Sequence, residues 1–439
     1  MHFIIMLASL AVLLVLGIPI AIALLISGVL GYMLTIGIDP GISALAQISF
    51  SDINSFVIIA IPLYILMGQI MLKGESGRDL FDFAQRITHR LPGGLVIAAI
   101  LASAIFAAIS GSSTATAATI GSISIPEMLK RGYDKRMAAG AVAVAGSLGI
   151  LIPPSISFIL YSLVTGASVG KLFLAGILPG IMLAVLFSMY TIWATVRALP
   201  SEAPDNKHVQ ATSDDNPISH DLPSMSWGMI GSLLMIIVVL GSIYAGLATP
   251  TEAAAIGVAY ALALTAWIKR TLGWRKLAQA AQDSVMTSAM ILMLIAGASV
   301  FGNTLSLLQV PQEVAAWLDS LSLAAWQFLI AINVLYLILG MFMDASAAIL
   351  VTVPILLPAL SALGIDLIWF GVILVINMEI GAVTPPVGMN LFVVKSLHDD
   401  YTISDVLIGS LPYALMGLVG LALVIIFPQT ALWLPSFSQ

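Results

Sequence analysis

The sequence has 439 residues, of which 60% are hydrophobic and only 9% are charged, and its mean hydropathy is +1.08. This composition excludes an ordinary water-soluble domain and predicts an all-α protein that crosses a lipid bilayer several times. The chain has no cysteine, which excludes disulfide bonds, thiolate metal sites and cysteine nucleophiles. The net charge of −6 says little about partners, and the positions of Lys and Arg along the chain carry more information. No nucleic-acid partner is expected.

The first apolar segment, residues 3–34, has neither a basic start nor a clear cleavage site. We therefore predict a retained transmembrane helix rather than a signal peptide. A crossing helix needs about 20 apolar residues. Nine segments meet this requirement, and two of them contain a Pro-Pro pair. They are residues 3–34, 54–73, 136–165, 172–197, 227–247, 251–268, 284–305, 366–395 and 404–428.

Two further apolar regions, 93–128 and 325–361, are too long for one helix, and small polar residues split each of them near its middle. Lys and Arg flank the first region on both sides, whereas none lies between Lys276 and Lys395 around the second. Because Lys and Arg gather on the cytoplasmic side, both regions are predicted to be re-entrant hairpins that enter from opposite faces. The same charges predict a cytoplasmic N-terminus and a periplasmic C-terminus, with fifteen of the sixteen Lys and Arg inside.

The chain contains an internal duplication centred on two motifs, GILIPPS at 149–155 and GAVTPPVG at 381–388. Adding 232 to a position in the first half gives its counterpart in the second, and six identities keep this offset without a gap. We therefore divide the chain into repeat 1 (1–198), a polar cytoplasmic linker (199–226) and repeat 2 (227–439). With the predicted crossings the two repeats have inverted topology, which is typical of transporters.

The chemistry is expected where the backbone is broken inside the membrane. A proline within a helix removes a hydrogen-bond donor, so each Pro-Pro pair leaves carbonyl oxygens without partners. In hydrocarbon these oxygens need protein, water or an ion, and a dehydrated sodium ion needs such ligands. Each hairpin tip adds side-chain oxygens, which favours two pseudosymmetric cation sites with a substrate between them. The tip residues are Ser112, Ser113, Thr114 and Thr116 in repeat 1, and Asp344 and Ser346 in repeat 2.

Two acids are predicted to lie inside the membrane, and both belong to repeat 2. Asp344 corresponds to Ser112, and Glu379 corresponds to Ser147. Acids at this depth are candidate functional residues. For Glu379 a structural role, as a protonated or paired acid that positions the broken helix, stays equally open. We expect the second cation site to carry a formal negative charge that the first lacks, so the two ions should bind with unequal affinity.

Three stretches carry a family resemblance: SGSSTATAATIG (110–121), GILIPPS (149–155) and EIGAVTPPVGMNLFV (379–393). They resemble the signature motifs of the large membrane subunit, of the DctM type, of tripartite ATP-independent periplasmic (TRAP) transporters. The resemblance runs from end to end and implies an elevator-type, sodium-driven importer of organic acids, such as dicarboxylates or sialic acids, in the bacterial inner membrane. It also implies two partners: a small four-helix membrane subunit, expected as a separate polypeptide, and a periplasmic substrate-binding protein.

Carried over by motif, the resemblance implies two sodium sites and one substrate site, with no cofactor besides the sodium ions. The first sodium site would comprise Ser112, Ser113, Gly149, Ile152 and Pro154. The second would comprise Asp344, Gly381, Val383, Thr384 and Pro386. The substrate would lie near Ser113, Thr116, Ser155, Thr384 and Asn390. Since no Lys or Arg is predicted at this depth, an anion would depend on bound sodium, hydroxyl groups and the N–H groups of helix N-termini.

Three other classes of protein match parts of this pattern. An intramembrane hydrolase would need a general base beside a buried serine, but all five histidines fall in termini or predicted loops, so no enzyme is expected. An ion channel also uses broken helices and carbonyl oxygens, yet inverted repeats with opposed hairpins favour alternating access. A binding-protein-independent sodium/dicarboxylate carrier of a related elevator fold stays open as an alternative. Only the residues of the motifs favour the TRAP family over it.

Overall fold

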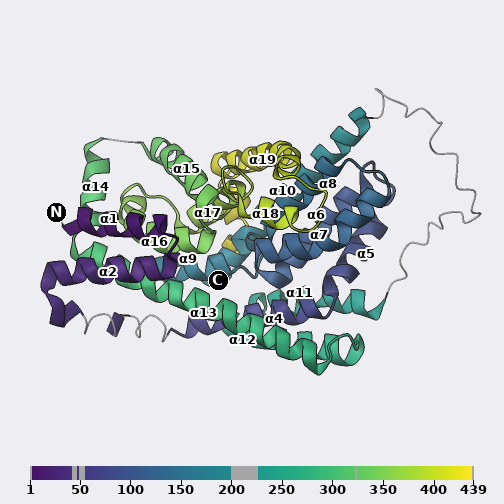
Figure 1. Ribbon diagram of the computed structural model, residues 1–439, viewed down its shortest axis with the longest axis horizontal. Helices are drawn as coiled ribbons and strands as arrows, with labels where there is room; N and C mark the ends of the chain where they lie inside the picture. Colours follow the sequence, from purple (N-terminus) through teal and green to yellow (C-terminus); the bar gives the residue numbers. More distant parts are fainter. Residues whose placement is uncertain (1, 42–46, 49–54, 199–225, 322–323, 438–439) are drawn as a thin grey trace, which may run out of the picture.

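The computed structural model describes all residues except 1, 42–46, 49–54, 199–225, 322–323 and 438–439, and the described part is built of helices (Figure 1). The first half contains α1 (His2–Val15), α2 (Ile20–Ile36), η1 (Phe56–Ile59), α4 (Ala60–Lys73), α5 (Ser76–Thr88), α6 (Gly94–Ser110), α7 (Ser113–Lys130), α8 (Lys135–Gly146), η2 (Ser147–Ile150), α9 (Ile156–Thr165) and α10 (Val169–Ala198). The second half contains α11 (Trp227–Tyr244), α12 (Pro250–Leu262), η3 (Ala263–Ile268), α13 (Trp274–Leu307), α14 (Val310–Ser320), α15 (Ala325–Phe342), α16 (Ala345–Ala362), α17 (Leu367–Gly381), α18 (Met389–Lys395), α19 (Ile403–Ile426), α20 (Gln429–Leu432) and η4 (Pro435–Phe437). Nearly all of the predicted linker, 199–226, lies outside the described residues.

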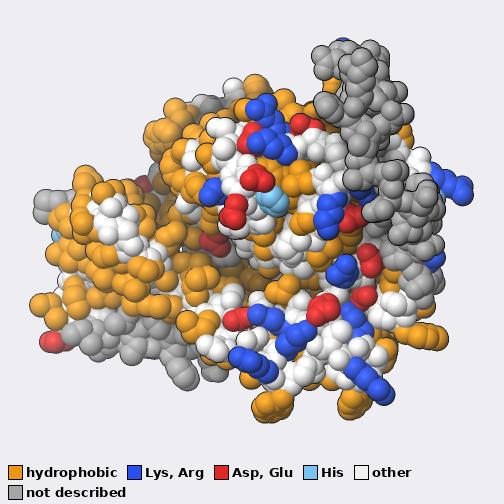
Figure 2. Space-filling model, turned by 45° about the vertical axis from the view of Figure 1, so that its right-hand side comes forward, with side chains coloured by type: hydrophobic (Ala, Val, Ile, Leu, Met, Phe, Trp, Pro, Cys, Tyr) orange, Lys and Arg blue, Asp and Glu red, His pale blue; other side chains and the backbone are white. Residues whose placement is uncertain are grey.

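The surface of the protein is suited to lipid. Eight helices of the described part are long and apolar enough to cross a bilayer, among them Trp227–Tyr244 and Ile403–Ile426. Large apolar side chains are exposed along many of these helices, which carries no penalty where the surroundings are lipid tails. Figure 2 shows this hydrophobic surface, with Lys, Arg, Asp and Glu gathered over one part of the molecule. The prediction of an all-helical, multi-pass membrane protein is confirmed.

The prediction of one helix over residues 3–34 is wrong, because this segment forms two helices. α1 and α2 pack side by side (Figure 1). α1 ends because Gly17 takes a left-handed φ of +77° and Pro19 cannot continue a helix. The internal repeat indicates the boundary between the two helices, which hydropathy does not show. Adding 232 to the bounds of α1 and α2 gives 234–247 and 252–268, the region of α11 and α12.

The helices of the two halves recur in the same order at the offset of 232. α1 and α2 correspond to α11 and α12, α4 to the second half of α13, and α5 to α14. The predicted hairpins at 93–128 and 325–361 are α6–α7 (hairpin 1) and α15–α16 (hairpin 2). The predicted broken helices at 136–165 and 366–395 are α8–η2–α9 and α17–α18, followed by α10 and α19. The hairpin and broken-helix architecture predicted from the sequence is confirmed in both halves.

Each hairpin packs against parts of both broken helices. Hairpin 1 contacts α8 and η2 of its own half, and α7 also contacts α18 of the other. In the same way α15 contacts α17, and α16 contacts α9. The helices α2, α4, α12 and α13, which we call the scaffold group, pack together along one side of the molecule (Figure 1). Two short helices connect the parts: α5 contacts α6, α7 and α11, and α14 contacts α13 and α16.

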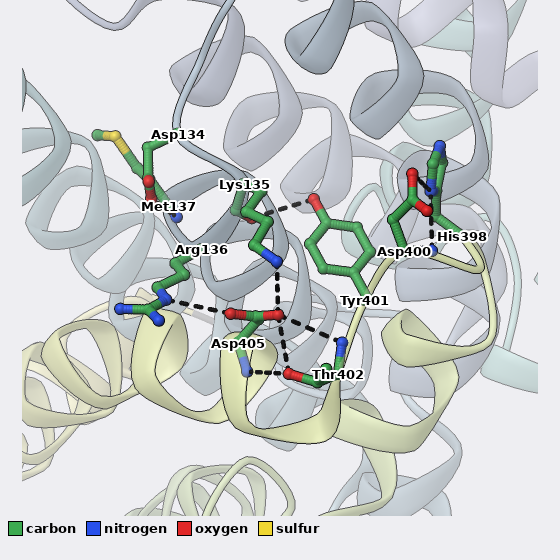
Figure 3. Close-up of polar contacts among 9 residues, drawn as sticks. All are labelled: Asp134, Lys135, Arg136, Met137, His398, Asp400, Tyr401, Thr402 and Asp405. Atoms are coloured by element: carbon green, nitrogen blue, oxygen red, sulfur yellow. Dashed lines mark hydrogen bonds and ion pairs between the residues drawn. The ribbon is translucent and has the colours of Figure 1, made fainter.

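A cluster of charged side chains fixes the start of α8 to the start of α19 (Figure 3). Lys135 Nζ and Arg136 Nε donate hydrogen bonds to the Asp405 carboxylate at 2.8 and 3.1 Å. Tyr401 Oη donates to the Lys135 carbonyl oxygen at 3.0 Å. Burial, together with the nearby carboxylates, raises the pKa of Tyr401 to about 12. The cluster joins the broken helix of the first half to the last long helix of the second.

Candidate functional site

The tip of hairpin 1 is a turn whose hydroxyl groups bond to one another. Gly111 takes a left-handed φ of +60°, which glycine adopts without strain, and reverses the chain between α6 and α7. Ser112 caps α7 by accepting a hydrogen bond from the Ala115 amide at 3.4 Å. Ser110 Oγ and Thr116 Oγ1 are 2.7 Å apart, and Thr116 also donates to the Ser112 carbonyl oxygen at 2.8 Å. These bonds hold the backbone of the tip in one conformation.

This tip lies directly against the first Pro-Pro break (residues 147–155). A Cβ atom added to Gly149 would lie 2.5 Å from the Ser112 carbonyl oxygen and 2.9 Å from the Ser113 Cα atom. A Cβ atom on Gly111 would lie 2.9 Å from the Pro154 carbonyl oxygen. Both contacts are with backbone, which cannot rotate away, so the approach of tip and break depends on glycine at both positions.

Several carbonyl oxygens of the first break are available to a ligand, among them the three predicted for the first sodium site. Within the described residues, no hydrogen bond ends on the carbonyl oxygens of Gly149, Ile152 or Pro154. The two prolines supply no N–H group, and the Ser155 hydroxyl donates to the Ile150 carbonyl oxygen instead. Unpaired carbonyl oxygens beside a hydroxyl-rich tip are oxygen ligands of the kind that a dehydrated cation needs.

The second break (residues 382–388) leaves a different set of oxygens open. Asp344 caps α16 at the tip of hairpin 2. The Thr384 amide donates to the Gly381 carbonyl oxygen at 2.9 Å, whereas the corresponding oxygen of the first break is unpaired. In the described structure the carbonyl oxygens of Val383, Thr384 and Pro386 accept no hydrogen bond. These oxygens are among those of the second break that are available to a ligand.

The two hairpins are seated differently on their breaks. Ser112 faces Gly149 in the first half, so a symmetric arrangement would bring Asp344 to Gly381. Gly381 instead faces Gly340, about one helical turn before Asp344, and a Cβ atom on Gly381 would lie 2.6 Å from the Gly340 Cα atom. Hairpin 2 is therefore displaced by about one turn along its break relative to hairpin 1.

A cavity of about 800 Å³ lies between the two hairpin tips and the scaffold helices α4 and α13. This volume is within the range of small-molecule sites. Its polar lining includes Ser112, Ser113 and Asp344 from the tips, together with Glu379 from α17. No Lys, Arg or His is among the described residues that line it. The cavity can hold a small molecule between oxygen-rich walls.

The scaffold group contributes two polar lining residues that the sequence did not single out, Gln69 of α4 and Thr287 of α13. Gln69 Oε1 is buried and has no hydrogen-bond partner in the described structure. Hydropathy cannot show which polar residue of a crossing helix faces a cavity, because α4 and α13 are apolar on several sides.

Four residues predicted near the substrate lie behind the cavity wall rather than on it. The hydroxyl groups of Thr116, Ser155 and Thr384 donate to backbone carbonyl oxygens of the tip, of the first break and of the last turn of α17. Asn390 Nδ2 donates to the Ala143 carbonyl oxygen at 3.4 Å. In this structure these side chains brace the backbone that surrounds the cavity, and their contact with substrate stays a prediction.

Paired hairpins, paired broken helices and a polar cavity between them define a membrane transporter with internal repeats, and not an enzyme. The sequence profile of one family, described as "Tripartite ATP-independent periplasmic transporter, DctM component", matches residues 7–430. The chain belongs to this family, which confirms the family resemblance of its motifs.

Known relatives resemble the chain over nearly its whole length. It is 39% identical over 397 residues to the C4-dicarboxylate TRAP transporter large permease protein DctM of Pseudomonas aeruginosa, covering 90% of each chain. It is 32% identical over 421 residues to the sialic acid TRAP transporter large permease protein SiaM of Vibrio cholerae, covering 95% of each. It is also 32% identical over 439 residues to the ectoine TRAP transporter large permease protein TeaC of Halomonas elongata, covering 98% of each. The crystal structure of the Alcanivorax borkumensis YdaH transporter matches with a TM-score of 0.61 over 89% of this chain and 90% of that chain; at 16% identity this similarity supports the fold alone.

Proposed function

We propose that this chain carries an organic acid anion across the bacterial inner membrane together with sodium ions. The observation that carries this proposal is the cavity between the two hairpin tips, adjoining a break in which the carbonyl oxygens of Gly149, Ile152 and Pro154 accept no described hydrogen bond. Relatives named for C4-dicarboxylates, sialic acid and ectoine support a small organic acid as the substrate.

The charge of the cavity gives a physical reason for coupling to sodium. Asp344 and Glu379 line it, and none of its described lining residues is cationic. An anionic substrate there would meet like charge in a medium of low dielectric constant, which costs several kcal/mol unless a cation compensates. Bound sodium supplies that compensation, so the anion binds tightly only when sodium is already present.

We further propose an elevator movement, in which the hairpins and broken helices move as a body against the scaffold group. The cavity lies between these two parts, with the tips on one wall and α4 and α13 on the other. α5 and α14 contact both parts and are suited to connect them during the movement. Displacement of one wall along the other would open the cavity to each side of the membrane in turn.

The orientation proposed for the chain follows from its N-terminal helices. The prediction of a cytoplasmic N-terminus counted residues 3–34 as one crossing, and α1 and α2 occupy that segment as two helices. No Lys or Arg lies before Lys73, so the charges that fix the later loops inside are unaffected. We therefore propose that both termini lie on the periplasmic side.

The family name supports a three-part assembly. The proposed partners are a small four-helix membrane subunit and a periplasmic substrate-binding protein. The test is uptake into proteoliposomes that contain this chain and its small subunit, with a C4-dicarboxylate, its binding protein and an inward sodium gradient. Uptake should require sodium and the binding protein, and should fall in Ser113→Ala and Thr384→Ala. Uptake without the binding protein would instead identify a binding-protein-independent sodium carrier, and uptake without sodium would refute the coupling.

A further inference from the structure

A second, smaller cavity lies between the two broken helices, where α10 and α19 cover it. Its lining pairs positions that are 232 residues apart, Val144 with Ile376 and Ser147 with Glu379. Ser147 and Glu379 are the polar members of the lining, and the other described residues there are apolar or glycine. The cavity therefore lies where the two repeats meet. Its one acid, Glu379, lines it together with Ser147, the residue at the equivalent position of repeat 1.

Glu379 belongs to the walls of both cavities. Its side chain is only 6% exposed, and its Oε2 atom has no hydrogen-bond partner in the described structure. Ser113, at the tip of hairpin 1, lines the larger cavity together with Glu379. No Lys, Arg or His is among the described residues that line either cavity. A buried carboxylate without a cationic partner costs several kcal/mol, so this position requires a positive charge that the lining does not supply.

We propose that Glu379 binds a monovalent cation at the junction of the two repeats, in addition to the two predicted sodium sites. The hydroxyl groups of Ser113 and Ser147 are the proposed neutral ligands. Ser147 Oγ donates to the Val144 carbonyl oxygen at 2.5 Å, which leaves its lone pairs for a cation. This inference rests on the proposed sodium symport, in which the ion would be one more coupling ion.

The ligand set favours a single positive charge. One carboxylate with two hydroxyl groups neutralises a monovalent ion, whereas calcium takes six to eight oxygens, several of them from carboxylates. Within the described residues no three His, Cys, Asp or Glu side chains gather closely enough to hold a metal ion. Sodium is the monovalent cation that the proposed symport already supplies.

The location gives this cation a direct effect on the substrate cavity. Ser113 belongs to hairpin 1, and Glu379 belongs to the broken helix of the other half. A cation between them would connect the two repeats through one ion. It would also neutralise one of the two acids that face the substrate, so an anion could approach at lower electrostatic cost.

Equilibrium binding of radioactive sodium to the purified full chain, without substrate or partner proteins, tests the inference. Glu379→Gln keeps the size and shape of the side chain and is expected to bind one sodium ion fewer per chain than the wild type. Ser147→Ala removes a neutral ligand and should weaken the affinity of one ion by about tenfold. If Glu379→Gln does not elute as a monodisperse protein, Ser147→Ala decides the test.

The outcomes separate this inference from the proposed function. Equal numbers of bound ions in the wild type and Glu379→Gln, with unchanged affinities in Ser147→Ala, would overturn the inference and assign a proton to the carboxyl group. If Asp344→Asn binds one sodium ion fewer than the wild type and Glu379→Gln does not, the inference is overturned as well, while sodium coupling is left intact. A wild-type chain that binds no sodium would overturn both.

Discussion

Helices α8 and α19 touch through their backbones, which makes their contact sensitive to a single methyl group. Gly409 lies against the Arg136 carbonyl group, and Gly140 lies against the backbone of Gly409. A Cβ atom at position 409 would overlap the Arg136 carbonyl oxygen, and this oxygen cannot rotate away. Gly409→Ala should therefore force the two helices apart next to the hydrogen bond between Arg136 and Asp405.

The expected magnitude combines two opposing effects. Overpacking against backbone costs about 3 kcal/mol, the upper part of the usual range, and the better helix propensity of alanine returns about 1 kcal/mol. The net loss in the free energy of unfolding is therefore about 2 kcal/mol. With an unfolding entropy of about 2.1 cal/mol/K per residue, a chain of 439 residues loses about 1 °C of melting temperature per kcal/mol. Gly409→Ala should melt about 2 °C below the wild type.

A matched control is expected to raise the melting temperature instead. Gly241 lies within α11, and a Cβ atom there would meet nothing within 4 Å. Gly241→Ala should thus gain only the helix propensity and melt about 1 °C above the wild type. Thermal unfolding of the purified protein in detergent, followed by tryptophan fluorescence, compares the three chains. A melting temperature for Gly409→Ala at or above that of the wild type would refute the close backbone contact.

Three further changes test other contacts. Gly149→Ala places a methyl group 2.9 Å from the Ser113 Cα atom and should abolish the proposed sodium-dependent uptake in proteoliposomes. Uptake at the wild-type rate would contradict the close contact between the tip of hairpin 1 and the first break. Lys269→Met leaves Asp79, with 18% of its side chain exposed, without its ion-pair partner and should cost about 2 kcal/mol, less than for a fully buried pair. Adding Asp79→Asn should restore part of the lost melting temperature, and a further decrease would argue against the pair. The pKa of Tyr401 is raised from 10.0 to about 12, so its contribution to stability is present below pH 10 and is lost as the pH rises towards 12; the melting temperature of Tyr401→Phe should fall less over this interval.

The hairpins and broken helices could be predicted because their signals are local and strong. Lys and Arg on both sides of 93–128 exclude a single crossing, and each Pro-Pro pair removes hydrogen-bond donors at a fixed place. The division of 3–34 was missed because its apolar residues run on without a polar gap. Hydropathy gives no boundary there, and within the segment itself only Gly17 and Pro19 mark the turn.

The candidate site was predicted in part, for a similar reason. Ser112, Ser113 and Asp344 could be assigned to the cavity because hairpin tips must meet the breaks that lack hydrogen-bond donors. The scaffold residues Gln69 and Thr287 could not, since their place on the wall depends on how separate helices pack. Tertiary packing of this kind leaves no periodic signal in the apolar sequence of a crossing helix.

The displaced seating of hairpin 2 follows from where each hairpin has its glycine. In repeat 1 the glycine is Gly111 at the tip itself, and the break approaches there. The counterpart of Gly111 is Met343, whose side chain excludes the same approach, and Gly340 stands where repeat 1 has Ala108. The second break therefore meets the hairpin about one turn earlier. The two repeats keep the same order of helices. The replacements of Gly111 by Met343 and of Ala108 by Gly340 at equivalent positions determine where each hairpin meets its break. The two tips thus present their oxygens to the cavity in different arrangements, in addition to the charge that Asp344 brings to only one of them.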